Sequence, residues 1–164
     1  MIKMEKTKRK VSESRAVLAT VTLPQDANQY GNVFGGAIMK LVDEIAYVSA
    51  ARHARTNIVT ASLDKMDFLS PVHVGDLLTL SSSINAAWHS SMEVGVRVTA
   101  ENVRTGEVRH TGSSYVTVVA LGADGKPTAV PELVLETDED IRRNKEANER
   151  RRRRLKERSR HAHE

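Results

Sequence analysis

The sequence contains no cysteine and no long apolar run, and these absences narrow its class. Without cysteine, disulfides, thiol catalysis and thiolate-bound metal are excluded, and we expect a soluble protein of the cytoplasm. No apolar run reaches the length of about 18 residues that predicts a transmembrane helix, and the charged N-terminus lacks the apolar segment of a secretory signal. Walker, dinucleotide-binding and nucleophile-elbow motifs are also absent, which leaves no nucleotide-hydrolase or serine-hydrolase signature.

Positive charge lies at the two ends of the 164-residue chain. Residues 1–10 carry a net charge of +4 and residues 136–164 carry +3, whereas residues 11–135 carry −3. We therefore predict a basic leader over 1–12, one domain over 13–135 and a charged, Arg-rich extension over 136–164. The extension includes Arg150 to Arg154 but almost no apolar residue, which predicts an exposed helix or a disordered tail. Thr137 and Asp140 form a capping pattern at its start. A nucleic acid or other polyanion partner for this tail is one interpretation, and a merely solubilising role is the other.

The apolar pattern predicts one long helix among antiparallel strands. The helix follows Gly35–Gly36 over residues 37–54 and is apolar on most sides. The predicted strands cover residues 15–23, 58–69, 77–88, 92–103 and 107–121. The fourth strand alternates most clearly between apolar and polar residues, as a half-buried strand does. We therefore predict an α+β fold in which a curved antiparallel sheet wraps around the long helix.

Asp43 is the most informative residue for chemistry, because it lies in the middle of this mostly apolar helix. A carboxylate in such a setting is costly to bury unless it is paired. Asp43 therefore serves as a general base or nucleophile, or it lies on one exposed stripe of the helix with Lys40 and Glu44.

Two features precede Asp43 in the chain. Gly36 lies at the helix start, where free backbone N–H groups suit an oxyanion and glycine allows close approach. Seven residues separate it from Asp43, about 10 Å along the helix. Asn28 is either a turn residue or an amide that orients water or a carbonyl. The six histidines predict no metal site, since only the terminal pair His161 and His163 is closely spaced, and we interpret that pair as exposed.

Three separated segments resemble the acyl-CoA thioesterases of the hotdog fold, in the bacterial YciA-like and eukaryotic cytosolic acyl-CoA hydrolase group. They are NQYGNVFGGAIMKLVDEIA (28–46), VTASLDKMDFLSPVHVGD (59–76) and HSSMEVGVRV (89–98). The resemblance covers about residues 19–131 and leaves the Arg-rich extension outside the shared region. It implies the same fold as the apolar pattern, with hydrolysis of acyl-CoA to a free acid and CoA.

The resemblance also implies roles for individual residues. Asp43 matches the catalytic carboxylate, Asn28 matches a catalytic asparagine supplied by the neighbouring subunit, and Gly36 matches the position whose N–H polarises the thioester carbonyl. Two segments match strands that contact CoA, namely Ala61, Ser62 and Leu63, and Ser90, Ser91 and Met92. Dimers assembled into hexamers are expected, with no metal or other cofactor. Trp88 departs from the family pattern, which implies a narrower CoA groove or stacking on the adenine.

The residues leave several questions open. General-base and nucleophilic roles of Asp43 are equally compatible with the sequence. The candidates for holding the CoA phosphates are Arg97, Arg104, Arg109 and the basic ends of the chain. A non-catalytic acyl-CoA sensor that uses its tail for a polyanion is the main alternative function. A hotdog dehydratase ranks last, because that chemistry needs a histidine at the start of the helix or in its preceding loop, and none lies there.

Overall fold

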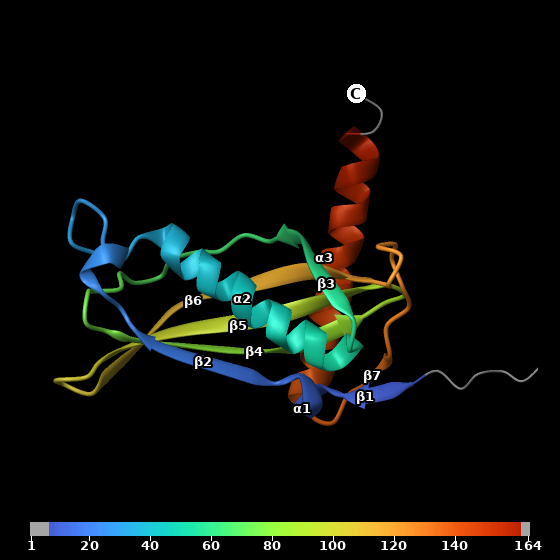
Figure 1. Cartoon of the computed structure of the whole chain (residues 1–164), viewed down its shortest axis with the longest axis horizontal. Helices are drawn as coiled ribbons and strands as arrows, with labels where there is room; N and C mark the ends of the chain where they lie inside the picture. The colour runs from blue at the N-terminus through green and yellow to red at the C-terminus, as the bar shows by residue number, and fades with distance from the viewer. Residues whose placement is uncertain (1–6, 162–164) are drawn as a thin grey trace, which may run out of the picture.

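A computed structural model describes residues 7–161, and a five-stranded antiparallel sheet curled around one long helix forms its body (Figure 1). The strand order is β2, β4, β5, β6, β3. Their bounds are Ala16–Val21 for β2, Leu77–Ala87 for β4, Ser91–Asn102 for β5, Glu107–Leu121 for β6 and Asn57–Leu63 for β3. Helix α2, Gly35–Ala54, lies on the inner face of the sheet. The predicted fold class is confirmed.

The core lies between α2 and the sheet because both present aliphatic side chains at the right period. Val42, Ala46 and Ala50 of α2 are fully buried. In β5 every second residue from Met92 to Ala100 faces this core, as the alternation predicted. Residues between them, such as Glu93, face the other side of the sheet. That outer face carries a second helix.

The predicted strand over 58–69 is six residues too long. Strand β3 ends at Leu63, and residues 64–70 form a loop that crosses close over β6. The loop keeps two backbone bonds to β6, Asp64 N–H to the Tyr115 carbonyl and Leu69 N–H to the Thr111 carbonyl. The approach is close because Gly112 has no side chain, and a Cβ there would lie 2.8 Å from the Asp67 carbonyl oxygen.

The basic leader predicted over 1–12 is not separate from the body. Strand β1, Lys8–Lys10, pairs in parallel with β7, Glu132–Val134, and the short helix α1 covers Val11–Ser14. Ser14 is fully buried, and its hydroxyl accepts a hydrogen bond from the Ile84 N–H at 3.0 Å. Strand β1 pairs through backbone hydrogen bonds alone. Its side chains are charged, so the sequence gives no apolar pattern that would predict a strand there. Residues 1–6 lie outside the described chain.

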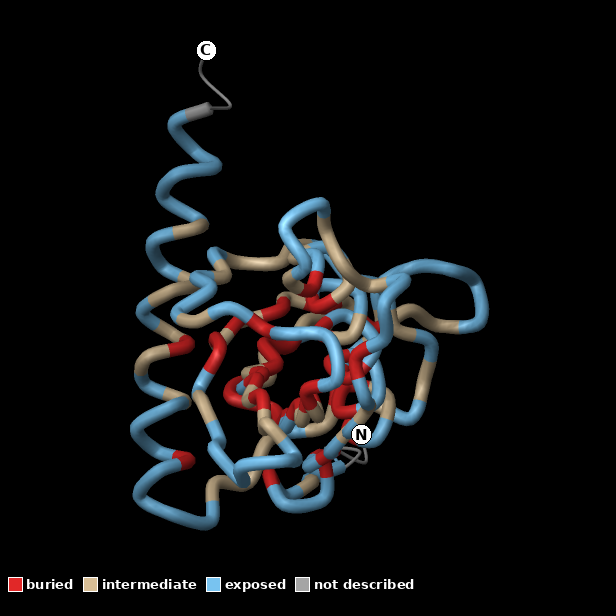
Figure 2. Tube along the Cα trace, turned by 90° about the vertical axis from the view of Figure 1, so that its left-hand side faces the viewer, coloured by how far each residue is buried: buried red, intermediate tan, exposed pale blue. Residues whose placement is uncertain are grey.

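The Arg-rich extension forms one 24-residue helix, α3, over Asp138–His161. The Thr137 hydroxyl accepts from the Asp140 N–H, and the Asp140 carboxylate accepts from the Thr137 N–H, both at 3.1 Å. This reciprocal cap is the one predicted. Helix α3 lies across the outer face of the sheet, opposite α2, and its last turns project beyond the body (Figure 2). Of the two predicted states, the extension therefore adopts the helix, which is exposed over its last turns and packs on the sheet before them.

Within residues 7–161, no helix combines the length and apolar character needed to cross a bilayer. His163 of the terminal histidine pair lies outside the described residues, and so does the side chain of His161.

Candidate active site

Asp43 lies on the exposed side of α2 and contacts the edge strand β3. The Thr60 hydroxyl donates a hydrogen bond to Asp43 Oδ1 at 2.6 Å. One helical position further on, Glu44 pairs with Lys40 at 3.8 Å. In a single chain Asp43 is exposed, as one of its two interpretations predicted, so burial imposes no cost on its charge. Thr60 distinguishes it from an ordinary surface carboxylate, because the bond fixes its orientation.

Gly35 and Gly36 occupy the first turn of α2, after Phe34 at the N-cap. Both glycines lie against aromatic rings. A Cβ on Gly35 would lie 3.2 Å from the Phe68 ring, and one on Gly36 would lie 2.5 Å from the Phe34 ring. The first N–H groups of α2 thus lie beside two exposed phenylalanines. This surface suits a ligand that combines a polar carbonyl with an apolar chain.

Asn28 lies in the loop before the glycines, after a 3₁₀ turn at Pro24–Asp26. Its Oδ1 accepts hydrogen bonds from the backbone N–H groups of Tyr30 at 2.9 Å and Asn32 at 3.2 Å. This is the turn role that the sequence offered as one interpretation. Asn28 and Asp43 share no hydrogen bond within one chain. The resemblance assigns that pairing to two subunits.

The two expected CoA-contacting segments differ in accessibility. Ala61 is exposed at a bulge in β3, and Ser62 and Leu63 are half-buried at its end. In the second segment Ser90 and Ser91 are half-buried, whereas Met92 is fully buried in the core. The strand alternation causes this difference, because Met92 points toward α2 and Ser91 points toward α3. A ligand therefore reaches the second segment through the serines.

Trp88 lies beneath α3, although the resemblance implied a contact with CoA. Its ring nitrogen donates to Asn148 Oδ1 at 3.0 Å, and the Arg151 guanidinium lies 4.3 Å from the centre of its ring. Arg151 Nη1 also donates to the Ser91 hydroxyl at 3.4 Å. The face of Trp88 under Arg151 is therefore closed to an adenine.

A buried ion pair that no sequence pattern predicted fixes α3 to the sheet. Glu93 is fully buried and receives Nε and Nη2 of Arg150 at 3.1 and 2.7 Å. Asn85 donates to the same carboxylate at 3.1 Å. Burial lowers the pKa of Arg150, but the bonds to Glu93 outweigh it and the pKa ends above its usual value. The sequence contains Glu93 and the run from Arg150 to Arg154, but no local motif connects residues that lie so far apart in the chain.

The candidate phosphate ligands differ in how far they are already paired. Arg109 binds Asp76 at 2.7 Å and is mostly buried, so its charge is compensated. Arg97 and Arg104 are exposed. Arg154 of α3 pairs with Asp64 at the start of the loop after β3.

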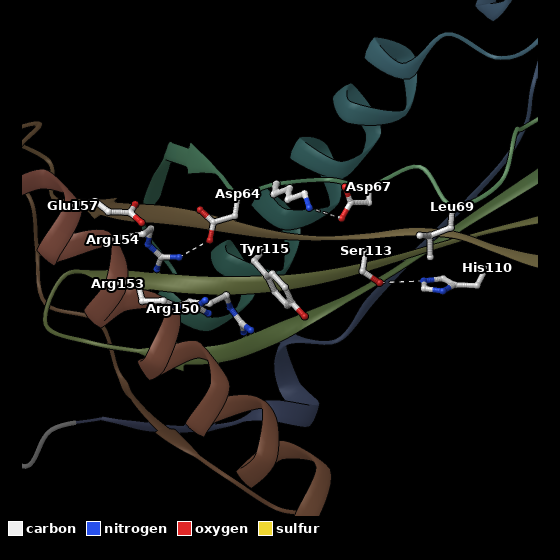
Figure 3. A pocket seen from close by; sticks show the side chains of 11 residues that line it. Asp64, Asp67, Leu69, His110, Ser113, Tyr115, Arg150, Arg153, Arg154 and Glu157 are labelled. Carbon is white, nitrogen blue, oxygen red and sulfur yellow. Dashed lines mark hydrogen bonds and ion pairs between the residues drawn. The ribbon is translucent and has the colours of Figure 1, made fainter.

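An open cleft of about 640 Å³ lies between α3, β6 and the loop after β3 (Figure 3). Arg150 and Arg154 line it on the α3 side, Tyr115 lies at its floor, and His110 bonds to Ser113 at its far end. Arg150 also lies 3.6 Å from the centre of the Tyr115 ring. The cleft contains neither Asp43 nor Gly36.

Comparison with known proteins gives consistent matches. Residues 30–107 match the model of the thioesterase superfamily. The chain is 44% identical over 129 residues to the uncharacterized acyl-CoA thioester hydrolase YkhA of Bacillus subtilis, a match that covers 79% of this chain and 75% of that protein.

Two solved structures extend the comparison. An acyl-CoA hydrolase from Staphylococcus aureus, solved with butyryl coenzyme A, coenzyme A and coenzyme A disulfide, is 36% identical with a TM-score of 0.88 and covers 95% of both chains. Variants of that enzyme with an Asn, an Asp or a Thr replaced by Ala were also solved. A hexameric acyl-CoA thioesterase in its apo form is 39% identical with a TM-score of 0.89, covering 92% of this chain and 97% of that one. The match to the Staphylococcus aureus hydrolase covers 95% of this chain and therefore includes most of α3, so the Arg-rich extension has a counterpart in that protein.

Proposed function

Since the chain belongs to the thioesterase superfamily, in which it is an acyl-CoA hydrolase, we propose that Asp43 is the carboxylate that promotes attack on the thioester. The observation that carries this proposal is the 2.6 Å bond from Thr60, which holds one carboxylate oxygen and leaves the other for chemistry. A thiolate is a good leaving group, so the reaction needs no metal or redox cofactor. The cytoplasmic location stays a prediction.

In the general-base form of the mechanism, Asp43 takes a proton from water while the water oxygen bonds to the thioester carbon. The backbone N–H of Gly36 and the N-terminus of α2 stabilise the resulting oxyanion. The C–S bond then breaks, CoA leaves as the thiolate and takes up a proton, and the acid remains. In the nucleophilic form, Asp43 itself bonds to the carbon, CoA leaves, and water cleaves the anhydride.

Oxygen isotope transfer into Asp43 identifies the nucleophilic form. A single turnover in H₂¹⁸O places the label in the acid product if water attacks the thioester directly or attacks the acyl carbonyl of an anhydride. If an anhydride forms and water attacks its Asp43 carbonyl, the label appears in Asp43. Mass spectrometry of the peptide that contains residue 43 reads this outcome.

Thiol release from a panel of short to long acyl-CoAs tests the catalytic role. We expect Asp43→Asn to lower kcat by about 10²- to 10⁴-fold, the usual contribution of a general base. Glu44→Gln is the matched control, because Glu44 is the adjacent exposed carboxylate of the same helix. Near-native turnover by Asp43→Asn would refute the role. Tight acyl-CoA binding by wild type without hydrolysis of any chain length would favour the sensor function.

We further propose that dimers form the active unit and assemble as trimers of dimers. The hexameric structure that this chain resembles supports this assembly. Exposed apolar side chains on α2 and β3 also support it, among them Met39, Tyr47 and Val59. Mixing Asn28→Ala subunits with Asp43→Ala subunits tests the shared site. A mixed dimer retains one intact Asn28–Asp43 pair, so activity above that of either variant is expected, and none would place both residues in one subunit's site.

A further inference from the structure

Arg151 of α3 lies against the sheet, over Trp88 and Ser91, without a carboxylate partner. Its neighbours Arg150 and Arg154 pair with Glu93 and Asp64. No carboxylate oxygen among the described residues lies within 4.0 Å of a side-chain nitrogen of Arg151. Building on the proposed function, we propose that Arg151, stacked on Trp88 beside Ser91, binds a phosphate group of the CoA thioester.

The guanidinium of Arg151 is held in a defined position. Trp88 supports its flat face at 4.3 Å, and Asn148 fixes the Trp88 ring through the ring nitrogen. Asn148 is in turn anchored to the Asn144 carbonyl at 2.9 Å. A cation–π contact leaves the edge N–H groups of the guanidinium available for an anion. One edge already points to the Ser91 hydroxyl, a further hydrogen-bond donor for a phosphate oxygen.

No carboxylate among the described residues neutralises the positive charge of Arg151. Burial lowers the pKa of Arg151, and repulsion from the nearby Arg154 lowers it further. Both effects reflect a positive charge that is partly removed from water and has no compensating anion. A bound phosphate supplies that anion through charge-assisted hydrogen bonds, for which a planar guanidinium is well suited.

The position along the sheet fits a substrate that also reaches Asp43. Ser91 pairs with Val119 of β6, and Val119 pairs with Val59 of β3. Val59 precedes Thr60, whose hydroxyl holds Asp43. Ser91 therefore lies level with Thr60, two strands or about 10 Å in from the β3 edge at the usual strand spacing, and Arg151 lies above Ser91 on the outer face. A CoA thioester bound at Arg151 then extends from the outer face past the β3 edge to reach Asp43 on the α2 side.

A pair of substrates that differ only in their phosphates tests this inference. The same acyl group is offered on CoA and on pantetheine, which has none. With Arg151→Gln we expect KM for the acyl-CoA to rise about tenfold, the loss of one charge-assisted hydrogen bond, and KM for the acyl-pantetheine to stay unchanged. Arg152→Gln is the matched control, because it removes the same charge from an exposed neighbour. Arg151→Lys keeps the charge without the planar fork and should raise KM for the acyl-CoA less.

Intrinsic fluorescence gives a readout independent of turnover, since Trp88 is the only tryptophan of the chain. In the wild type, CoA should change the emission of Trp88. In Arg151→Gln the same change should need about tenfold more CoA. Pantetheine and inorganic phosphate should not reproduce the change at the same concentrations. Equal KM changes for both substrates, an effect of Arg152→Gln as large as that of Arg151→Gln, or saturation by inorganic phosphate at the same concentration as CoA would overturn the inference. A wild type that hydrolyses nothing but shows the CoA-dependent fluorescence change would refute the proposed function and leave the phosphate site supported.

Discussion

Replacing Arg150 by Gln is the sharpest perturbation of how α3 is attached. Glu93 is fully buried, and Arg150 supplies two of the hydrogen bonds to its carboxylate. Asn85 supplies a third, and Arg154 lies 3.6 Å away. Among the described residues of α3, Ala147 is the only apolar one that is fully buried. Attachment of the helix therefore depends mainly on polar groups.

The loss of stability depends on whether Glu93 stays buried after Arg150 is replaced. Removing one partner of a buried pair strands the other charge and costs about 3 to 5 kcal/mol. For a chain of this size that corresponds to a fall in Tm of about 6 to 20 °C. If α3 detaches instead, water reaches Glu93, and the loss is limited to the free energy of docking the helix.

Thermal unfolding and limited trypsin digestion measure these two responses. Trypsin cleaves after arginine, and the run from Arg150 to Arg154 becomes a substrate once α3 leaves the sheet. We expect Arg150→Gln to lower Tm or to accelerate cleavage in this run. Arg142→Gln is the matched control, because Arg142 is an exposed arginine of the same helix whose ion pairs with Glu139 and Glu146 lie at the surface.

The double variant Arg150→Gln with Glu93→Gln tests the cause of the loss. Without charge on either side, no buried carboxylate is stranded, and we expect it to regain much of the stability that Arg150→Gln loses. The reasoning is refuted if Arg150→Gln unfolds at the wild-type temperature with wild-type resistance to trypsin. It is also refuted if the double variant is less stable than Arg150→Gln.

Two further predictions concern packing and pH. In Gly95→Ala the new Cβ would lie 2.6 Å from the Asn85 amide, so Asn85 must turn away from Glu93. We expect the free energy of unfolding, measured in urea, to fall by about 1 to 3 kcal/mol. The control Arg97→Ala, on the same face of β5, should change this free energy little. Burial lowers the pKa of His53 below 6.5. The hydrogen bond that His53 Nε2 donates to the Pro131 carbonyl raises the pKa in part, Arg9 lowers it further and Glu13 raises it. The unfolded chain therefore binds a proton at His53 more readily than the folded chain does. The stability that neutral His53 contributes is present above pH 6.5 and decreases as the pH falls below it. His53→Gln should therefore weaken the dependence of the unfolding free energy on pH between about pH 7 and 5.

Much of the body follows from local patterns in the sequence. The alternation from Met92 to Val98 predicted which face of β5 is buried, because a strand repeats every two residues. The apolar residues of α2 predicted a helix covered on most sides. Because one strand precedes this helix and strands follow it, a sheet curved around the helix was the expected arrangement. Asp43 was identifiable because a carboxylate conflicts with such a pattern. Its contact with Thr60 was not predicted, since the two lie on separate elements and no periodicity links them.

The docking of α3 escaped prediction for a different reason. Apolar residues reveal a buried helix face, and this helix has almost none. The polar residues through which it contacts the sheet are Arg150, Asn144 and Asn148, which in a sequence resemble solvated residues. Their partners lie far away along the chain, Asn144 reaching the Asn85 carbonyl at 3.0 Å. Polar docking leaves no trace in hydropathy, so only the three-dimensional structure identifies Glu93 as its centre.

The segment from Ser91 to Glu93 links this docking to the substrate. Met92 is held in the core, which fixes the strand, and its two neighbours both face α3 as a result of the strand period. Glu93 binds Arg150, and Ser91 contacts Arg151 one residue further along the same helix. Loss of Arg150 should therefore disturb the Arg151 position as well and raise KM together with its effect on Tm. Loss of Arg151 leaves the buried pair intact, so a change in KM without a change in Tm separates recognition of phosphate from attachment of the helix.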